Sequence, residues 1–279
     1  MSKPIMAILY DFDKTLCKDD MQNFSFIPAL GMTPKEFWGA TTVFSAKTGV
    51  ERILSYMYMM IKLSKEKGIK LTREYLNSLG RDIRYFDGVT TWFDRINKYG
   101  KEQGVKVEHY LVSSGTKEIV EGCSIAKKFE KIYGCEFLYD EETLEPIWPK
   151  LAINYTQKTQ YFFRISKGVI DENDDNKLNE KSTKRRIPYR NIVYLGDGMT
   201  DVPSMILVKN NGGKSIAVYS EGNKEKVIPL YEGDRVNYIC RADYSAGSDL
   251  EKVMKLIIDS IKISDSLKKK EITLLNKDE

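Results

Sequence analysis

The sequence of 279 residues predicts an α/β protein in which a mostly parallel sheet carries an inserted helical domain. Short aliphatic and β-branched runs alternate with helical stretches along most of the chain, which is typical of parallel sheets. Residues 18–85 break this alternation, because they have helical character and contain no strand run. A helix with one apolar face lies near the C-terminus. These three observations predict a core built around one sheet and a smaller helical unit.

Six runs carry the strand signal, at residues 5–10, 105–112, 131–139, 191–195, 215–219 and 238–241. They are rich in aliphatic, β-branched and aromatic residues, which favour strands. Two of the runs end directly in loops rich in Asp or Ser. Ligands bind outside the carboxyl ends of the strands in open α/β sheets, so we expect functional residues in these loops.

Residues 18–85 are predicted to form an inserted helical domain. Their aromatic and methionine residues are more typical of a hydrophobic core than of a substrate pocket: Phe37, Trp38, Phe44, Tyr56, Met57, Tyr58, Met59 and Met60. The predicted domains are a core of residues 1–17 and 86–265, a helical domain of residues 18–85, and a polar C-terminal tail of residues 266–279.

The C-terminal helix is indicated by apolar residues with helical spacing, at Leu250, Val253, Met254, Ile257, Ile258 and Ile261. Ser248 precedes them as a candidate N-cap. The highly charged stretches 171–186 and 268–279 are predicted to be a solvated loop and a solvated tail.

Composition restricts the chemistry of the chain. Lys and Arg number 44 against 40 for Asp and Glu, so the formal charge of +4 favours neither nucleic acid nor a membrane as partner. Four cysteines without a CxxC pair, and no signal peptide, indicate a cytoplasmic protein. His109 is the only histidine, which excludes a multi-histidine metal site, and it is predicted to be a structural or an exposed residue. Catalysis must then depend on carboxylates, lysine and hydroxyls.

Asp11 and Asp13 follow the first strand run. In an extended segment their side chains point the same way, and Phe12 points the opposite way. Two carboxylates about 4 Å apart repel each other by roughly 4 kcal/mol at an effective dielectric constant of about 20. The pair therefore requires a cation such as Mg²⁺, or a proton held by a raised pKa.

Three further groups follow later in the chain. Asp197 and Asp201 lie in a glycine-containing loop, which permits a tight turn and presents carboxylates to a hard cation. Either Ser113 or Ser114 could offer a hydroxyl to an anion, and the backbone N–H groups there fit phosphate. Lys158 would balance negative charge in an acidic pocket.

These motifs occur in the order of, and resemble, the four motifs of the haloacid dehalogenase superfamily: DxDxT from Asp11, Ser113, Lys158 and GDGxxD from Gly196. The resemblance spans residues 11–201. It implies a Rossmann-like core with a cap domain inserted after the first motif, which matches the segment 18–85. It also places the chain with the branch that includes the phosphoserine phosphatases, which has a helical C1-type cap.

The resemblance implies a catalytic role for each residue. Asp11 would be the nucleophile that forms a phospho-aspartyl intermediate, and Asp13 would be the general acid and then the general base. Asp201 would support the metal site and Lys158. Dehalogenase branches lack an aspartate at the position of Asp13, so its presence favours phosphoryl chemistry.

The resemblance also implies the ligands. Mg²⁺ would be held by Asp11, the Asp13 carbonyl and Asp197. The phosphoryl oxygens would be bound by Ser113 and the amide of Ser114. The expected enzyme is thus a Mg²⁺-dependent phosphatase that hydrolyses a small phosphorylated metabolite.

Substrate and oligomeric state stay open at this level. In phosphoserine phosphatases a Glu nine residues after the nucleophile holds the substrate amine, and Asp20 takes that position here. Arg52 could bind a substrate carboxylate. Lys14 and Ser114 differ from the residues usual in those enzymes, so other small phosphomonoesters are preferred over phosphoserine.

Other functions are compatible with the same motifs. A phosphotransferase or phosphomutase would use the same residues, and a catalytically quiet module that binds a phosphorylated ligand would keep the fold. The pair Lys14-Thr15 is shared with P-type ATPases, but no membrane helix accompanies it. Residues 212–215 lack the spacing of a P-loop and precede a strand.

Overall fold

The computed structural model describes residues 3–181 and 185–275. Within these residues seven strands form one sheet in the order β4-β3-β2-β1-β5-β6-β7. They are β1 (Ile5–Tyr10), β2 (Lys106–Thr116), β3 (Lys131–Tyr139), β4 (Pro146–Leu151), β5 (Ile192–Gly196), β6 (Lys214–Tyr219) and β7 (Tyr238–Arg241). Every neighbouring pair is parallel except β3 and β4, so the predicted mostly parallel sheet is confirmed.

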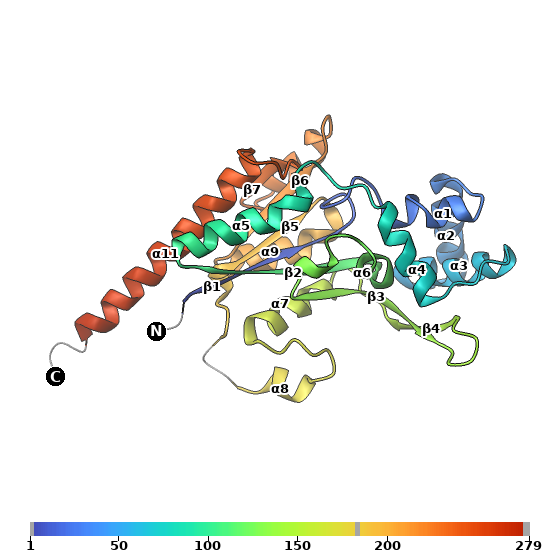
Figure 1. Ribbon diagram of the computed structural model, residues 1–279, viewed down its shortest axis with the longest axis horizontal. Coiled ribbons are helices and arrows are strands. Elements are labelled where there is room, and N and C mark those ends of the chain that lie inside the picture. The colour runs from blue at the N-terminus through green and yellow to red at the C-terminus, as the bar shows by residue number, and fades with distance from the viewer. Residues whose placement is uncertain (1–2, 182–184, 276–279) are drawn as a thin grey trace.

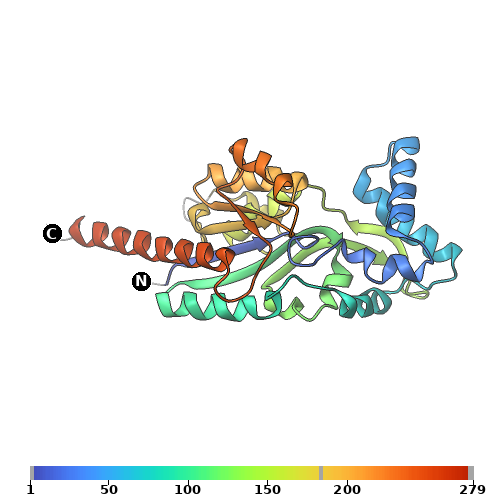
Figure 2. The same ribbon diagram turned by 90° about the horizontal axis from the view of Figure 1, so that it is seen from above.

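Helices pack on both faces of the sheet. The helices of the described residues are α1 (Phe26–Ala29), α2 (Pro34–Thr48), α3 (Arg52–Glu66), α4 (Arg73–Leu79), α5 (Val89–Gln103), α6 (Lys117–Glu121), α7 (Lys158–Lys167), α8 (Asp175–Asn179), α9 (Val202–Asn210), α10 (Ile228–Glu232) and α11 (Asp249–Leu275). Helix α5 packs against β2 and α11, and α9 packs against β5 and β6. Figure 2 shows α5 on one side of the strands and the yellow to orange helices of the α9 and α10 region on the other.

The central strand β1 is apolar because helices cover both of its faces. Its residues 6–10 are all buried. The Tyr10 hydroxyl forms a hydrogen bond with His109 Nδ1 at 3.0 Å, and His109 Nε2 forms one with Asn97 Oδ1 at 3.1 Å. Burial lowers the pKa of His109 to about 3, so the imidazole is neutral at physiological pH. This histidine is buried in the core, which fits the structural alternative of the two that the sequence left open.

All six predicted strand runs are strands, but two details differ from the predictions. Strand β2 continues to Thr116, which pairs with Cys135 after a register shift that follows Val112, so Ser113 and Ser114 lie within the strand. Strand β4 was not predicted. Pro146 and Pro149 weaken its sequence signal, and such residues are tolerated because β4 is the antiparallel edge of the sheet.

Helices α1–α4 fill most of residues 18–85 and lie at one end of the molecule (Figure 1). Helix α2 begins with a capping box between Thr33 and Glu36 and ends at Gly49, whose φ of 75° is left-handed. It packs against α3. Of the expected core residues, Phe37, Tyr56, Met57, Met59 and Met60 are buried, Trp38 and Phe44 are partly buried, and Tyr58 is exposed. The division into core and cap domains stays a prediction.

Two stretches predicted to be irregular contain helix. Residues 171–186 include α8, whose Asp175 binds Arg164 at 2.6 Å, and residues 182–184 lie outside the described part. Helix α11 continues through the predicted tail to Leu275, because Lys, Glu and Leu favour helix and Lys269 pairs with Asp265 one turn earlier. Residues 276–279 are not described. The predicted cap Ser248 accepts from the Glu251 N–H at 3.2 Å.

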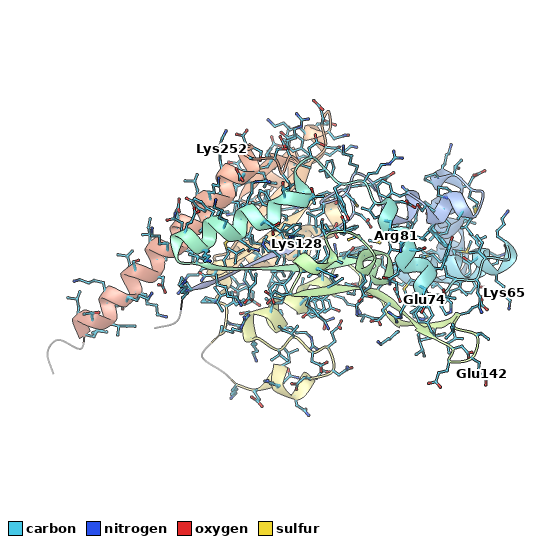
Figure 3. The ribbon with its side chains drawn as sticks, viewed as in Figure 1. Lys65, Glu74, Arg81, Lys128, Glu142 and Lys252 are labelled. Atoms are coloured by element: carbon cyan, nitrogen blue, oxygen red, sulfur yellow. The ribbon has the colours of Figure 1, made fainter. Side chains whose placement is uncertain are left out.

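Most charged side chains lie on the outside of the molecule, as Lys65, Glu142 and Lys252 do at its periphery in Figure 3. The four cysteines are buried and free. Within residues 3–181 and 185–275, no helix combines the length and the hydropathy that crossing a bilayer requires.

Candidate active site

The candidate site begins where β1 ends. The Asp11 N–H donates to the Leu195 carbonyl at 2.9 Å, which fixes Asp11 beside the end of β5. Asp11 and Asp13 face the same pocket, while Phe12 between them is fully buried in the core. The alternation of an extended segment therefore places both carboxylates together, as predicted.

The chain turns sharply after Asp13. Lys14 has a φ of 57°, a left-handed conformation that is uncommon for a residue other than glycine. The N–H groups of Leu16 and Cys17 both donate to the Phe12 carbonyl. This turn brings the Lys14 ammonium to Asp20, whose two carboxylate oxygens both lie 2.8 Å away. The pair closes one side of the pocket.

Lys158 is the first residue of α7, and its side chain contacts Asp11. Its ammonium donates to Asp11 at 2.7 Å and to Asp201 at 2.8 Å, and all three residues are buried. Burial alone would lower the pKa of Lys158, but the charges of Asp11 and Asp201 raise it. One lysine is thus held charged between two buried carboxylates.

The loop after β5 folds tightly around Asp201. A Cβ atom on Gly196 would lie 2.4 Å from Asp201 Oδ2, so only glycine fits there. Asp201 accepts from the Tyr194 hydroxyl at 2.6 Å and from the Asp197 N–H at 3.1 Å. These bonds fix Asp201 and leave the side chain of Asp197 facing the pocket.

The carboxylates at this end of the sheet outnumber the buried cations. Burial, followed by the charges of Asp201 and Asp11, raises the pKa of Asp197 to about 8. Burial raises the pKa of Asp11 to about 6 despite Lys158, and burial with Asp20 and Asp11 raises that of Asp13 well above its usual range. An added cation or a bound proton would relieve this repulsion.

Three of these carboxylates could share one metal ion. Oxygens of Asp11, Asp197 and Asp201 lie within 4.8 Å of one another. Carboxylate oxygens suit hard cations such as Mg²⁺. The cluster contains the predicted ligands Asp11 and Asp197, together with Asp201, the residue expected to support the metal site.

The predicted phosphate-binding serines line the same pocket as Asp11 and Asp197. Ser113 Oγ accepts from the Gly115 N–H at 2.9 Å and can still donate to an anion. Ser114 Oγ is buried without a hydrogen-bond partner among the described residues, and its carbonyl accepts from Tyr56 at 2.8 Å. Both serines are among the residues that line the pocket, so both remain candidates.

Asp11, Asp13, Lys158, Asp197 and the two serines line one pocket of about 370 Å³. Arg52 does not line it; this residue is exposed at the start of α3, and the neighbouring Ile53 lines the pocket instead. Asp20 lines it but is paired with Lys14. Five lining residues carry no sequence signal for the pocket, because loop conformation and the position of α3 bring them there: Lys14, Ile53, Tyr155, Met199 and Thr200. The complete lining is Asp11, Asp13, Lys14, Asp20, Ile53, Ser113, Ser114, Tyr155, Lys158, Asp197, Gly198, Met199 and Thr200.

Comparison with known proteins places this geometry in a family. Residues 8–205, which include every motif named above, match the sequence model of the haloacid dehalogenase-like hydrolases. An uncharacterized protein of Borreliella burgdorferi is 28% identical over 274 residues, which covers 88% of this chain and 94% of that protein.

Several solved structures share the fold. A substrate-bound phosphoserine phosphatase has a TM-score of 0.57 at 16% identity, with coverage of 91% of this chain and 99% of that chain. Cytosolic 5'-nucleotidase IIIB bound to cytidine has a TM-score of 0.53 at 14% identity, with coverage of 94% and 87%. A probable phosphoserine phosphatase from Vibrio cholerae has a TM-score of 0.58 at 11% identity, with coverage of 94% and 67%.

Proposed function

This chain belongs to the haloacid dehalogenase-like hydrolases, and we propose that it is a Mg²⁺-dependent phosphatase that hydrolyses a small phosphomonoester through a phospho-aspartyl intermediate on Asp11. One observation carries the proposal. The Asp11 carboxylate is held by Lys158 at 2.7 Å in a pocket that Asp13, Ser113 and Asp197 also line. A nucleophile, a proton carrier, anion-binding groups and metal ligands therefore meet at one point.

In the first proposed step, a carboxylate oxygen of Asp11 attacks the phosphorus and the ester P–O bond breaks. Asp13 gives its proton to the leaving alcohol oxygen. The raised pKa of Asp13, which follows from burial and from the charges of Asp20 and Asp11, supports this role. Met21 orients the carboxyl group, because its N–H donates to Asp13 Oδ1 at 2.8 Å.

In the second proposed step, water attacks the phosphorus of the acyl phosphate. Asp13 accepts a proton from that water, and the P–O bond to Asp11 breaks to release inorganic phosphate. Lys158 stays between Asp11 and Asp201 and balances negative charge in both steps. Ser113 and Ser114 would donate to the phosphoryl oxygens.

We propose that Asp11 and Asp197 hold Mg²⁺ with the Asp13 carbonyl, and that Asp201 supports them. The mutual repulsion of these carboxylates and their spacing within 4.8 Å for Asp11, Asp197 and Asp201 support the fit. When bound, Mg²⁺ would neutralise charge on the phosphoryl group and on Asp11.

The substrate is proposed to be a small phosphorylated metabolite other than an amino acid phosphate. Asp20, the one pocket-lining acid outside the catalytic set, is already paired with Lys14 through both oxygens, and Arg52 lies outside the pocket. Residues 18–85 would act as the cap that excludes water from the pocket. Four buried free cysteines support a cytoplasmic setting.

A panel of phosphorylated metabolites with Mg²⁺, assayed for released phosphate, tests the proposal. We expect turnover of at least one compound, and a loss of about a thousandfold or more for Asp11→Asn, which keeps the side-chain shape but removes the nucleophile. The exposed Asp94→Asn is the matched control and should leave turnover unchanged. Phosphate transfer to an added alcohol would favour a phosphotransferase. Absence of turnover with every compound would contradict the proposal.

A further inference from the structure

The C-terminal half of α11 projects away from the body of the molecule, as Figures 1 and 2 both show. Ile261 is the last buried side chain among the described residues of this helix. Residues 262–275 therefore extend about 21 Å past it, at 1.5 Å per residue. A single helix of this length is marginally stable in water without packing, which suggests that another surface covers it.

Large apolar side chains are exposed along one line of α11. Leu256 and Leu267 are each 67% exposed, Ile263 is 59% exposed and Leu274 is 53% exposed. This line is distinct from the face that packs against the body, which carries Leu250, Met254, Ile257, Ile258 and Ile261. The helix thus has two apolar faces, and its own chain covers one of them.

The exposed line has the spacing of a coiled coil. Its positions are separated by four, three, four, three and four residues, and we call them the α11 seam: Leu256, Ser260, Ile263, Leu267, Lys270 and Leu274. Alternation of three and four keeps a stripe facing a partner helix over several turns. The two polar members of the seam are Ser260 and Lys270, and they decide how a partner can pair with it.

We propose that the α11 seam binds the same seam of a second copy of this chain, with the two helices antiparallel. The seam is self-complementary about a two-fold axis at residue 265. Leu256 of one copy then meets Leu274 of the other, Ile263 meets Leu267, and Ser260 meets Lys270. Every large apolar side chain of the seam has an apolar partner, as an isologous interface requires.

The charge of Lys270 selects the antiparallel arrangement. In a parallel pair, Lys270 would face Lys270 of the second copy inside the seam, where like charges repel. In the antiparallel pair it faces the uncharged Ser260 of the second copy. The two bodies then lie at opposite ends of the helix pair.

Sedimentation equilibrium of the full chain tests the dimer. We expect a mass of twice 32.1 kDa at micromolar concentration. Leu274→Glu should raise the dissociation constant about 100-fold or more, since it places two charges in apolar layers of the dimer. Leu275→Glu is the matched control, because Leu275 is adjacent and 70% exposed but lies off the seam, and it should dimerise normally. A monomeric wild type, or equal effects of the two variants, would overturn the proposal.

Cross-linking tests the orientation. Leu256→Cys and Leu274→Cys, carried on differently tagged chains, should form a disulfide between the two variants when mixed and little within either variant alone. Self-cross-linking of each variant would show a parallel pair and contradict the antiparallel seam. Binding of the monomer to vesicles of anionic lipid, lost in Leu274→Glu, would show that a membrane surface covers the seam and would also overturn the proposal. Both tests are independent of phosphatase activity.

Discussion

Two charged clusters, each built around buried carboxylate, differ in how the negative charge is balanced. Among the described residues of the candidate site, Lys158 is the only cation that pairs with Asp11 and Asp201, and Asp197 has no ion pair. In the second cluster, Glu136 on β3 is surrounded by three cations from three other elements. They are Arg73 of α4 at 3.3 Å, Lys117 of α6 at 3.0 Å and Lys150 of β4 at 3.0 Å.

The balance of charge is reflected in opposite pKa shifts. Burial alone would raise the pKa of Glu136, but Lys150 and Lys117 lower it to about 2. Burial and neighbouring carboxylates raise the pKa of Asp197 to about 8. The balanced cluster links α4 to the sheet and needs no ligand. The site cluster lacks positive charge, which a metal ion or a proton would supply.

Removal of one lysine from each cluster should give the largest contrast. Lys158→Met leaves Asp11 and Asp201 buried without a cation, so we expect a loss of about 3–5 kcal/mol in the free energy of unfolding, together with loss of turnover. Lys150→Met should cost about 1 kcal/mol or less, because Lys150 is 56% exposed and Glu136 keeps two cations. Urea unfolding in EDTA measures both. Equal losses would contradict the contrast.

Metal ion should stabilise only the cluster that lacks positive charge. At a Mg²⁺ concentration of about 100 times the dissociation constant, the free energy of unfolding should rise by about 2.7 kcal/mol. Thermal unfolding with and without Mg²⁺ checks this. Asp197→Asn should reduce the increase, whereas Glu136→Gln should respond as wild type does. A response that is independent of Asp197 would indicate that the ion binds elsewhere.

Neutralising the carboxylate of the balanced cluster should affect stability and not catalysis. Glu136→Gln keeps the size of the side chain but leaves three cations without their shared anion. We expect a loss of about 1–2 kcal/mol, limited by the partial exposure of Arg73 and Lys150. Turnover should stay within about threefold of wild type. A larger loss of turnover would assign this cluster a functional role.

The same variant should change the acid stability. The pKa of Glu136 falls from 4.5 to about 2 on folding. Its contribution to the free energy of unfolding is therefore fully present above pH 4.5 and is lost as the pH falls toward 2. One proton limits the slope to about 1.4 kcal/mol per pH unit, and partial exposure reduces it. Between pH 3 and pH 5, the free energy of unfolding should therefore change less with pH in Glu136→Gln than in wild type. The same pH dependence in Glu136→Gln and wild type would contradict the role of these ion pairs.

Much of the site could be predicted because parallel strands bring distant motifs to one edge. Asp11, Ser113 and Asp197 each follow or end an apolar strand run, and the carboxyl ends of β1, β2 and β5 are neighbours in the sheet. The family resemblance added Lys158 to this set, and Lys158 lines the same pocket.

The remaining features depend on conformation and packing that sequence patterns do not encode. The ion pair between Lys14 and Asp20 requires a left-handed backbone at Lys14, and glycine, the usual sequence signal for that conformation, is absent there. The cluster around Glu136 joins four separate elements, none of which carries a motif. Strand β4 contains two prolines and an exposed Trp148, so its pattern does not resemble a strand.

The central claim is that the carboxylate of Asp11 becomes covalently phosphorylated. Acid quenching during turnover of a substrate found in the metabolite panel, followed by peptide mass spectrometry, tests this most directly. We predict one phosphoryl group on the peptide that contains Asp11, located on Asp11 itself and absent in Asp11→Asn. A phosphoryl group on Asp13, or rapid turnover with no covalent intermediate in any quenched sample, would contradict the account.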